Sequence, residues 1–342
     1  MHTILPIAHQ VALNDKNTFG VVATAAAYLK VTDIALLQAL RRDPLWSAMP
    51  RLVLGGGSNI LLTRDFAGLV LHMQNGGIEV VCGDATAVHV RAAAGESWHG
   101  LVLWTLAHGY AGLENLSLIP GSVGAAPIQN IGAYGVEVRE LIQEVRVFDF
   151  VTGEITALDN AACEFAYRDS VFKHRLRDQV VILDVTFSLP KAWQANTRYA
   201  DVAQELAARA ITQPSARQIS DAVIAIRSRK LPDPAVIGNA GSFFKNPLVD
   251  AVQREDLLGK FPQLVSYVQP DGRYKLAAGW LIDQCGWKGK SLGAAGVYEK
   301  QALVLVNRGG AHGSDIVALA QAISADVSQR FGVALEAEPV FI

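Results

Sequence analysis

The chain has 342 residues, of which 51% are hydrophobic and 18% are charged, and its formal net charge is −2. This length and apolar content predict two or three domains with large cores, which argues against wholesale disorder. The near-neutral charge provides no basic stripe for binding nucleic acid. Three widely spaced cysteines, Cys82, Cys163 and Cys285, argue against a disulfide framework and predict reduced, mostly buried thiols.

Residues 1–6 lack the basic and apolar regions of a signal peptide, and no apolar run approaches the ~20 residues of a membrane helix. We therefore expect a cytoplasmic protein with no membrane insertion and no nucleic-acid partner. No obligate protein partner is evident either. The eight histidines show no metal-ligand spacing, so we expect no catalytic metal.

The first region predicts a strand, a helix and a strand. Thr32 is the candidate N-cap of a helix over residues 33–41, where apolar residues recur with helical spacing. A short strand over residues 52–54 leads directly into the sequence GGGSN at residues 55–59. A further strand is expected over residues 68–73. This order places a glycine-rich loop at the end of a buried strand.

A second region starts near residue 77 and a third follows the helix-breaking sequence Leu231-Pro232-Asp233-Pro234. We predict domains over residues 1–76, 77–229 and 230–342, and the last strand could return to the first part. Paired strands mixed with helices indicate α+β modules and not a repeating βαβ barrel. The expected strands are 78–82, 87–93, 145–150, 180–189 and 302–307, and the expected helices are 98–108 (capped by Ser97), 202–209, 216–229, 276–285 and 314–331.

The glycines at residues 55–57 allow two interpretations. Their backbone N–H groups could turn toward one point and let a phosphate come close, or they could simply form a tight turn. The loop does not match a dinucleotide-binding fingerprint, because Ile60 stands where G-x-G-x-x-G needs its third glycine. A P-loop is disfavoured too, since Gln284 stands where Gly289-Lys290-Ser291 would need its first glycine.

The segment at residues 119–135 has no charged residue among its 17 and contains four glycines. It could be a buried connector or a backbone wall around a flat polar ligand. Two further segments, 167–170 and 238–247, concentrate reactive residue types in expected loops. Ser242, between a glycine and two phenylalanines, fits either a core hydroxyl or a dry, positioned proton donor. Asn115-Leu116-Ser117 matches a glycosylation sequon, which has no meaning without a secretory signal.

Eight segments form an ordered series of long motifs. They are GGGSN at 55–59, IPGSVGAAPIQNIGAYG at 119–135, FAYRDSVFK at 165–173, RKLPDP at 229–234, GNAGSFFKNP at 238–247, KLAAGWLIDQCGWKG at 275–289, QALVLVN at 301–307 and LEAE at 335–338. Together they resemble the UDP-N-acetylenolpyruvoylglucosamine reductase family, from about residue 17 to the end of the chain. The surroundings of Trp193, Arg198 and Tyr199 resemble an insertion found in one subtype of the family.

The resemblance implies a vanillyl-alcohol-oxidase-type FAD-binding fold of two α+β subdomains, followed by an α+β substrate-binding domain. It implies that GGGSN receives the FAD pyrophosphate and that residues 120–134 surround the flavin. Neither motif contains a histidine, so the flavin is expected to be noncovalent. The implied FAD contacts are Gly55, Gly56, Gly57, Ser58, Asn59, Pro120, Gly121, Ser122, Gly124, Ala125, Asn130, Ile131, Gly132 and Tyr134.

The implied reaction is the NADPH-dependent reduction of UDP-N-acetylglucosamine enolpyruvate to UDP-N-acetylmuramate, in peptidoglycan precursor synthesis. Hydride from reduced flavin adds to C3 of the enolpyruvyl group and a proton reaches C2. By resemblance, Ser242 donates the proton, Arg168 binds the substrate carboxylate and Glu338 stabilises the enol-like state. Glu336, on the same strand face, is the alternative carboxylate. The implied substrate contacts are Tyr199, Lys230, Asn246 and Gln301.

One departure concerns the C-terminal sequence, where the family pattern is closer to LEPEVRFIG. Here the proline lies after Glu338, and Val340 stands where the pattern has an arginine that contacts the flavin in related enzymes. One implied FAD contact is therefore in doubt. Two other functions remain open: an FAD oxidase or dehydrogenase of the same fold acting on a small alcohol, and a flavin-binding module without catalysis.

Overall fold

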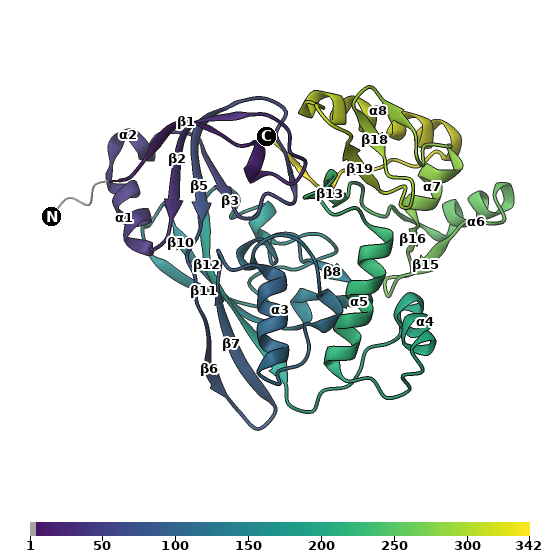
Figure 1. Cartoon of the computed structure of the whole chain (residues 1–342), viewed down its shortest axis with the longest axis horizontal. Helices are drawn as coiled ribbons and strands as arrows, with labels where there is room; N and C mark the ends of the chain where they lie inside the picture. Colours follow the sequence, from purple (N-terminus) through teal and green to yellow (C-terminus); the bar gives the residue numbers. More distant parts are fainter. Residues whose placement is uncertain (1–4) are drawn as a thin grey trace. The chain divides into compact units, whose positions relative to one another are not determined.

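The computed structural model describes residues 5–342, which Figure 1 traces in chain order. The chain forms two compact units. Unit 1 contains the described residues up to Val11, residues 25–57 and residues 66–229; unit 2 contains residues 12–24, 58–65 and 230–342. The chain therefore passes from one unit to the other five times, after residues 11, 24, 57, 65 and 229.

Unit 1 begins with a four-stranded sheet in the order β1-β2-β5-β3, in which β5 pairs in parallel with β2 and with β3. Asp33, and not the expected Thr32, caps the first helix. Its carboxylate accepts a hydrogen bond from the Leu36 N–H, because Asp33 is the last extended residue before the helix. The elements are β1 (Ala8–Ala12), β2 (Thr24–Val31), α1 (Ile34–Arg42), α2 (Pro44–Ser47), β3 (Arg51–Leu54) and β5 (Phe66–Met73).

A second sheet of unit 1 has five antiparallel strands in the order β11-β10-β12-β7-β6. Alternate residues of the long strands face the core, and α3 packs on that face through Trp98, whose ring meets Phe187 edge-on at 5.8 Å. Ser97 caps α3 through the Gly100 N–H, as expected. The elements are β6 (Ile78–Gly83), β7 (Ala87–Ala93), α3 (Trp98–Ala107), β10 (Ile142–Asp149), β11 (Ile155–Asp159) and β12 (Val180–Pro190).

The two sheets of unit 1 share one hydrophobic core, which includes residues on both sides of the predicted limit at 76/77. The predicted subdomain limits stay a prediction. Between the strands run short 3-10 turns and a small hairpin, and two helices complete the unit. These elements are η2 (Glu114–Leu116), η3 (Val123–Ala125), β8 (Gly132–Ala133), β9 (Val136–Glu137), η4 (Val138–Glu140), η5 (Val171–Lys173), α4 (Ala200–Ala208) and α5 (Ala216–Lys230).

Unit 2 contains a four-stranded sheet, β13-β19-β18-β17, a three-stranded sheet, β14-β16-β15, and a two-stranded parallel ladder, β20-β4. The helix expected over 276–285 is shorter in the structure, where α7 occupies Ala278–Gln284. Leu276 belongs to the preceding strand, β16 (Tyr274–Leu276). The elements are η1 (Asn14–Lys16), β4 (Ile60–Leu61), β13 (Gly238–Ser242), β14 (Leu248–Val249), α6 (Ala251–Lys260), β15 (Ser266–Val268), β16, α7 (Ala278–Gln284), β17 (Ser291–Leu292), β18 (Ala295–Val297), β19 (Val304–Asn307), α8 (Gly313–Phe331) and β20 (Val340–Phe341).

The cysteines are free thiols, as expected, but the expectation of burial is right only for Cys163. Cys82 is exposed because it lies on β6, the edge strand of the five-stranded sheet, and Cys285 is half-buried at the end of α7. Within residues 5–342, no helix combines the length and apolar character that crossing a membrane requires.

Candidate active site

The two glycine-containing segments expected to bind FAD lie against each other in unit 1. A Cβ atom on Gly55 would lie 2.2 Å from Ser122 Oγ, and one on Gly56 would lie 2.9 Å from Gly121 Cα. Gly57 and Gly121 have φ angles of 62° and 115°, which favour glycine. At Gly56 and Gly121 backbone therefore packs directly against backbone, and a larger residue at position 56 would prevent this contact.

The second segment is fixed by the end of β7 and the start of α3. The Gly121 carbonyl accepts a hydrogen bond from Trp98 N–H at 3.0 Å, and Gly124 N–H donates to the Ala94 carbonyl at 2.9 Å. A Cβ on Gly124 would lie 2.6 Å from the Cβ of Ala94. Rigid elements thus hold this backbone in place, which is what a preorganised binding surface requires.

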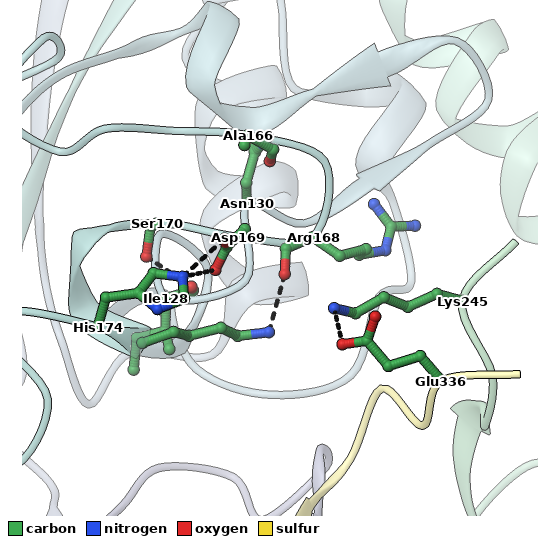
Figure 2. Close-up of polar contacts among 10 residues, drawn as sticks. Ile128, Asn130, Ala166, Arg168, Asp169, Ser170, His174, Lys245 and Glu336 are labelled. Atoms are coloured by element: carbon green, nitrogen blue, oxygen red, sulfur yellow. Dashed lines mark hydrogen bonds and ion pairs between the residues drawn. The ribbon is translucent and has the colours of Figure 1, made fainter. Parts of the chain in front are cut away.

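Asn130 is fully buried, and the chain itself engages both ends of its side-chain amide. Its Nδ2 donates to the Ala166 carbonyl at 2.9 Å and to Glu137 Oε2 at 3.0 Å, and its Oδ1 accepts from Arg139 N–H at 3.1 Å. Asn130 thus joins the segment of residues 120–134 to the turn that carries Arg168 (Figure 2). Only its backbone fits the role of an FAD contact.

Arg168 lies beside the predicted flavin wall. Its Nη2 donates to the Gly132 carbonyl at 2.9 Å, and its backbone has φ 55°, a conformation rare for arginine. Lys173 Nζ donates to the Arg168 carbonyl at 2.8 Å, and Ser170 Oγ donates to the Ile128 carbonyl at 2.6 Å. The structure therefore brings the YRDS motif and the charge-free segment together, and Figure 2 shows part of this network.

Tyr134 and Tyr199 also come together in unit 1. Their rings meet edge to face, with centroids 5.2 Å apart, and the Tyr134 hydroxyl hydrogen-bonds Arg227 of α5. Arg227 Nε donates to the Leu118 carbonyl at 3.2 Å. Burial raises the pKa of Tyr134, while the charge of Arg227 opposes the rise; burial lowers the pKa of Arg227 itself.

Arg227 and His99 were missed by the sequence reasoning. His99 Nδ1 accepts from Leu118 N–H at 3.0 Å. Burial, and then the charge of Arg227, lower the pKa of His99, so the ring is neutral at pH 7. His99 lies on α3 and Arg227 on α5, and neither belongs to a recognisable sequence pattern. Only the fold brings them to the Leu118 backbone.

In unit 2, Ser242 and Glu338 lie on adjoining backbone segments. Ser242 ends β13 after Gly241, whose φ is 69°. The next residue, Phe243, accepts a hydrogen bond from Glu338 N–H at 2.8 Å through its carbonyl. Asn59 Nδ2 donates to the Glu338 carbonyl at 3.3 Å. Three of the predicted site residues are therefore neighbours in unit 2.

Glu336, the alternative carboxylate, has different surroundings. Its side chain is 72% exposed and forms an ion pair with Lys245 (Figure 2). Glu338 is half-buried. Water weakens the electrostatic interactions of a carboxylate. A carboxylate that acts on a substrate therefore interacts more strongly when it is partly buried. The surroundings favour Glu338 over Glu336.

The other predicted substrate contacts of unit 2 are Asn246 and Gln301, which lie in loops, and Lys230, which ends α5. Asn246 Oδ1 accepts from Ala278 N–H, the first residue of α7, at 2.9 Å. Gln301 Oε1 accepts from Leu303 N–H at 3.3 Å, just before β19. Lys230 is the last residue of α5 and is exposed. Val340, in place of the family's arginine, pairs with Ile60 in the β20-β4 ladder.

Two family models match the chain. The model of an FAD binding domain matches residues 25–159, and the model of the UDP-N-acetylenolpyruvoylglucosamine reductase C-terminal domain matches residues 233–342. The first match contains the glycine surface of unit 1. The second contains Ser242 and Glu338.

Curated relatives match almost the whole chain. The UDP-N-acetylenolpyruvoylglucosamine reductase of Paraburkholderia phytofirmans is 58% identical over 330 residues, covering 96% of this chain and 95% of that protein. The protein of the same name from Burkholderia orbicola is 57% identical over 326 residues, covering 95% of this chain and 93% of that one. The chain belongs to the UDP-N-acetylenolpyruvoylglucosamine reductase family. As a member with an FAD binding domain, it is an FAD-dependent oxidoreductase.

The fold agrees with a solved structure of the family. The crystal structure of UDP-N-acetylenolpyruvylglucosamine reductase from Thermus caldophilus superposes with a TM-score of 0.67 and covers 99% of both chains at 23% identity. The fold class is therefore the α+β one expected from the sequence: a vanillyl-alcohol-oxidase-type FAD-binding fold followed by a C-terminal α+β domain.

Proposed function

We propose that this chain reduces UDP-N-acetylglucosamine enolpyruvate to UDP-N-acetylmuramate with NADPH, in peptidoglycan precursor synthesis. The observation that carries this function is membership of the reductase family along nearly the whole chain. The reaction adds a hydride to C3 of the enolpyruvyl group and a proton to C2. FAD, held by the backbone of residues 55–57 and 121–122, would supply the hydride-transfer chemistry between NADPH and the substrate.

The surface formed by residues 55–57 and 121–122 fits the role of holding FAD. Without Cβ atoms at Gly55 and Gly56 the two segments pack closely together, with Ser122 and Gly121 in the space that side chains would take. Glycine-rich backbone of this kind can present its N–H groups to a pyrophosphate. Asn130 and Arg168 fasten the later part of the segment 120–134: Asn130 donates to the Ala166 carbonyl, and Arg168 donates to the Gly132 carbonyl. Val340 stands where the family pattern has an arginine, so the flavin contact of that arginine is not expected in this chain.

Each of the three proposed catalytic residues has a different role. Arg168 offers a fixed guanidinium, which suits a carboxylate in two-point contact. As hydride reaches C3, negative charge develops at C2 and on this carboxylate. Ser242 then gives its proton to C2. A serine hydroxyl is a weak acid, but C2 becomes a strong base at that moment, and Glu338 supports the enol-like state beside it.

A titration of the yellow protein tests the function. NADPH should bleach the flavin colour, and the enolpyruvyl nucleotide, added without oxygen, should restore it. Restoration by a small alcohol's carbonyl product, and not by the nucleotide, would instead indicate an oxidase or dehydrogenase of the same fold. No bleaching by NADPH would leave a flavin-binding module without this catalysis.

Lys230→Ala should raise KM for the UDP substrate by about 10–100-fold, with little change in the reduction of flavin by NADPH. The proposed partner of Lys230 is the diphosphate, which is remote from C2 and C3, so its loss affects binding more than chemistry. A charged hydrogen bond is worth ~1.5–3 kcal/mol. Steady-state kinetics with the nucleotide measure the effect. Lys260→Ala, at the exposed end of α6, is the matched control; an unchanged KM in Lys230→Ala would remove Lys230 from the site.

We also propose a cytoplasmic location, since the reaction uses NADPH and a nucleotide sugar.

The segment around Trp193 and Tyr199 is proposed to be the insertion of the family subtype in which a tyrosine covers the bound nucleotide. The proximity of Tyr199 to Tyr134, within the FAD-binding unit, supports a place for it at the edge of the site.

A further inference from the structure

Residues 191–199, which we call the strap, connect β12 to α4 in unit 1. Three hydrogen bonds from side chains fasten this irregular segment to the η2 turn and to the end of the charge-free segment. Trp193 Nε1 donates to Glu114 Oε1 at 2.7 Å, Asn115 Nδ2 donates to the Asn196 carbonyl at 3.0 Å, and Asn196 Nδ2 donates to the Gly135 carbonyl at 3.1 Å. The strap ends at Tyr199.

Asn115 is the central fastening. It is 1% exposed, and its Nδ2 donates both to the Asn196 carbonyl and to the Tyr134 carbonyl, each at 3.0 Å. One amide therefore ties the strap to the loop that carries Tyr134. Its Oδ1 is buried and has no hydrogen-bond partner within residues 5–342. Asn115 thus uses both of its side-chain N–H donors and leaves its side-chain oxygen unpaired. We infer that the donors are the reason for an asparagine at this position.

Glu114 provides the second fastening. It is 2% exposed, and its carboxylate accepts from Trp193 Nε1 and, at 2.6 Å, from Gly112 N–H. A buried carboxylate is costly unless hydrogen bonds satisfy it. The bonds from Trp193 and Gly112 supply this compensation, and they fix where the strap leaves the sheet.

These fastenings determine where Tyr199 lies. Tyr199 follows the strap directly, and its ring stays 45% exposed while its edge contact with Tyr134 holds it in place. We propose that Asn115, assisted by Glu114, is a positioning residue for the substrate. It fastens the strap to the Tyr134 loop and so holds the exposed Tyr199 ring ready for the nucleotide half of the substrate. This inference rests on the proposed function.

Asn115→Asp is the sharpest test, because it keeps the shape of the side chain and removes both donors. A carboxylate facing the carbonyls of Tyr134 and Asn196 should release the strap. KM for the UDP substrate should rise about tenfold, the scale of two lost hydrogen bonds, while kcat and flavin reduction by NADPH change by less than about twofold. Trypsin should also cut faster after Arg198, which is exposed in the strap.

A double-mutant cycle separates positioning from general stability. If Asn115 acts through Tyr199, then Asn115→Asp should raise KM no further in a Tyr199→Ala background. Asn160→Asp is the matched control, since Asn160 Nδ2 also donates to two backbone carbonyls, those of Arg139 and Ile142, at 2.7 Å each. It should leave KM and cleavage after Arg198 unchanged.

An additive rise in the double variant, or unchanged tryptic cleavage in Asn115→Asp, would overturn the proposal. If Asn115→Asp does not fold, Trp193→Phe removes the other fastening without placing a charge in the core, and the same outcomes apply. A wild-type protein that fails to reduce the enolpyruvyl nucleotide would instead reject the proposed function. The cleavage assay reads strap release even then, because it needs no substrate.

Discussion

Ser242→Ala should slow the half-reaction with the enolpyruvyl nucleotide by about 10⁴-fold or more. General acid catalysis is worth ~10²–10⁴-fold, and an intermediate as basic as this one belongs at or above the top of that range. The half-reaction with NADPH should stay nearly intact, because it needs no proton at a substrate carbon. Ser242 is half-buried at the end of β13, beside the segment that carries Glu338, so alanine fits its place without disturbing the sheet. Stopped-flow absorbance of the flavin measures each half-reaction separately.

Ser242→Cys is the companion variant, since a thiol is still an acid and should recover part of the rate. The competing interpretation is that Ser242 only packs between Gly241 and Phe243. In that case alanine would leave both half-reactions at nearly wild-type rates. Small and equal effects on both would reject the proton-donor role and leave Glu338 as the candidate acid.

Gly56→Ala should weaken FAD binding by about 5–150-fold, the equivalent of the ~1–3 kcal/mol that overpacking costs. The new Cβ would lie 2.9 Å from Gly121 Cα, and backbone on both sides leaves no flexible side chain to move away. The two segments must then separate, which displaces the surface proposed to hold the pyrophosphate. Flavin content after dialysis, and fluorescence titration of the apoprotein with FAD, measure the loss.

Gly259→Ala is the control for this variant. Gly259 lies within α6, its Cβ would meet no atom within 4 Å, and alanine is the better helix former by ~1 kcal/mol. This variant should bind FAD normally and unfold at a slightly higher temperature. Normal FAD affinity in Gly56→Ala would show that the contact between residues 56 and 121 does not shape the cofactor site.

The sequence predicted the longer elements well where alternation or helical spacing was strong. The strand over 87–93 was predicted to the residue, since its apolar residues alternate toward one core face. The α8 helix was predicted to within one residue. Strands such as Leu248–Val249 and Ser291–Leu292 could not be predicted, because two residues carry no periodicity and only their partners define them.

The sequence could propose site residues only where they stand in contiguous motifs, and their roles stay predictions. Glycines such as those at 55–57 and 121 indicate that backbone could approach closely, because they have no side chain. The structure brings these two segments into contact. Asn115 shows the limit. The sequence offered it only as part of a glycosylation sequon without meaning, whereas its two bonds join residues 19 and 81 positions away. No local pattern encodes such a long-range role.

The five passages between the two units bear on how the chain reaches its native state. Residues 12–24 and 58–65 are synthesised early, but their partners in unit 2 follow residue 229. These segments therefore cannot pack into unit 2 until the C-terminal part of the chain has been synthesised. Phe19 packs against Phe243, and Ile60 pairs with Val340, at sequence separations that slow folding. A fragment starting at Lys230 would lack both segments. Unit 2 is thus no autonomous module that could be cut out at the helix end, and any domain exchange must carry all three of its pieces.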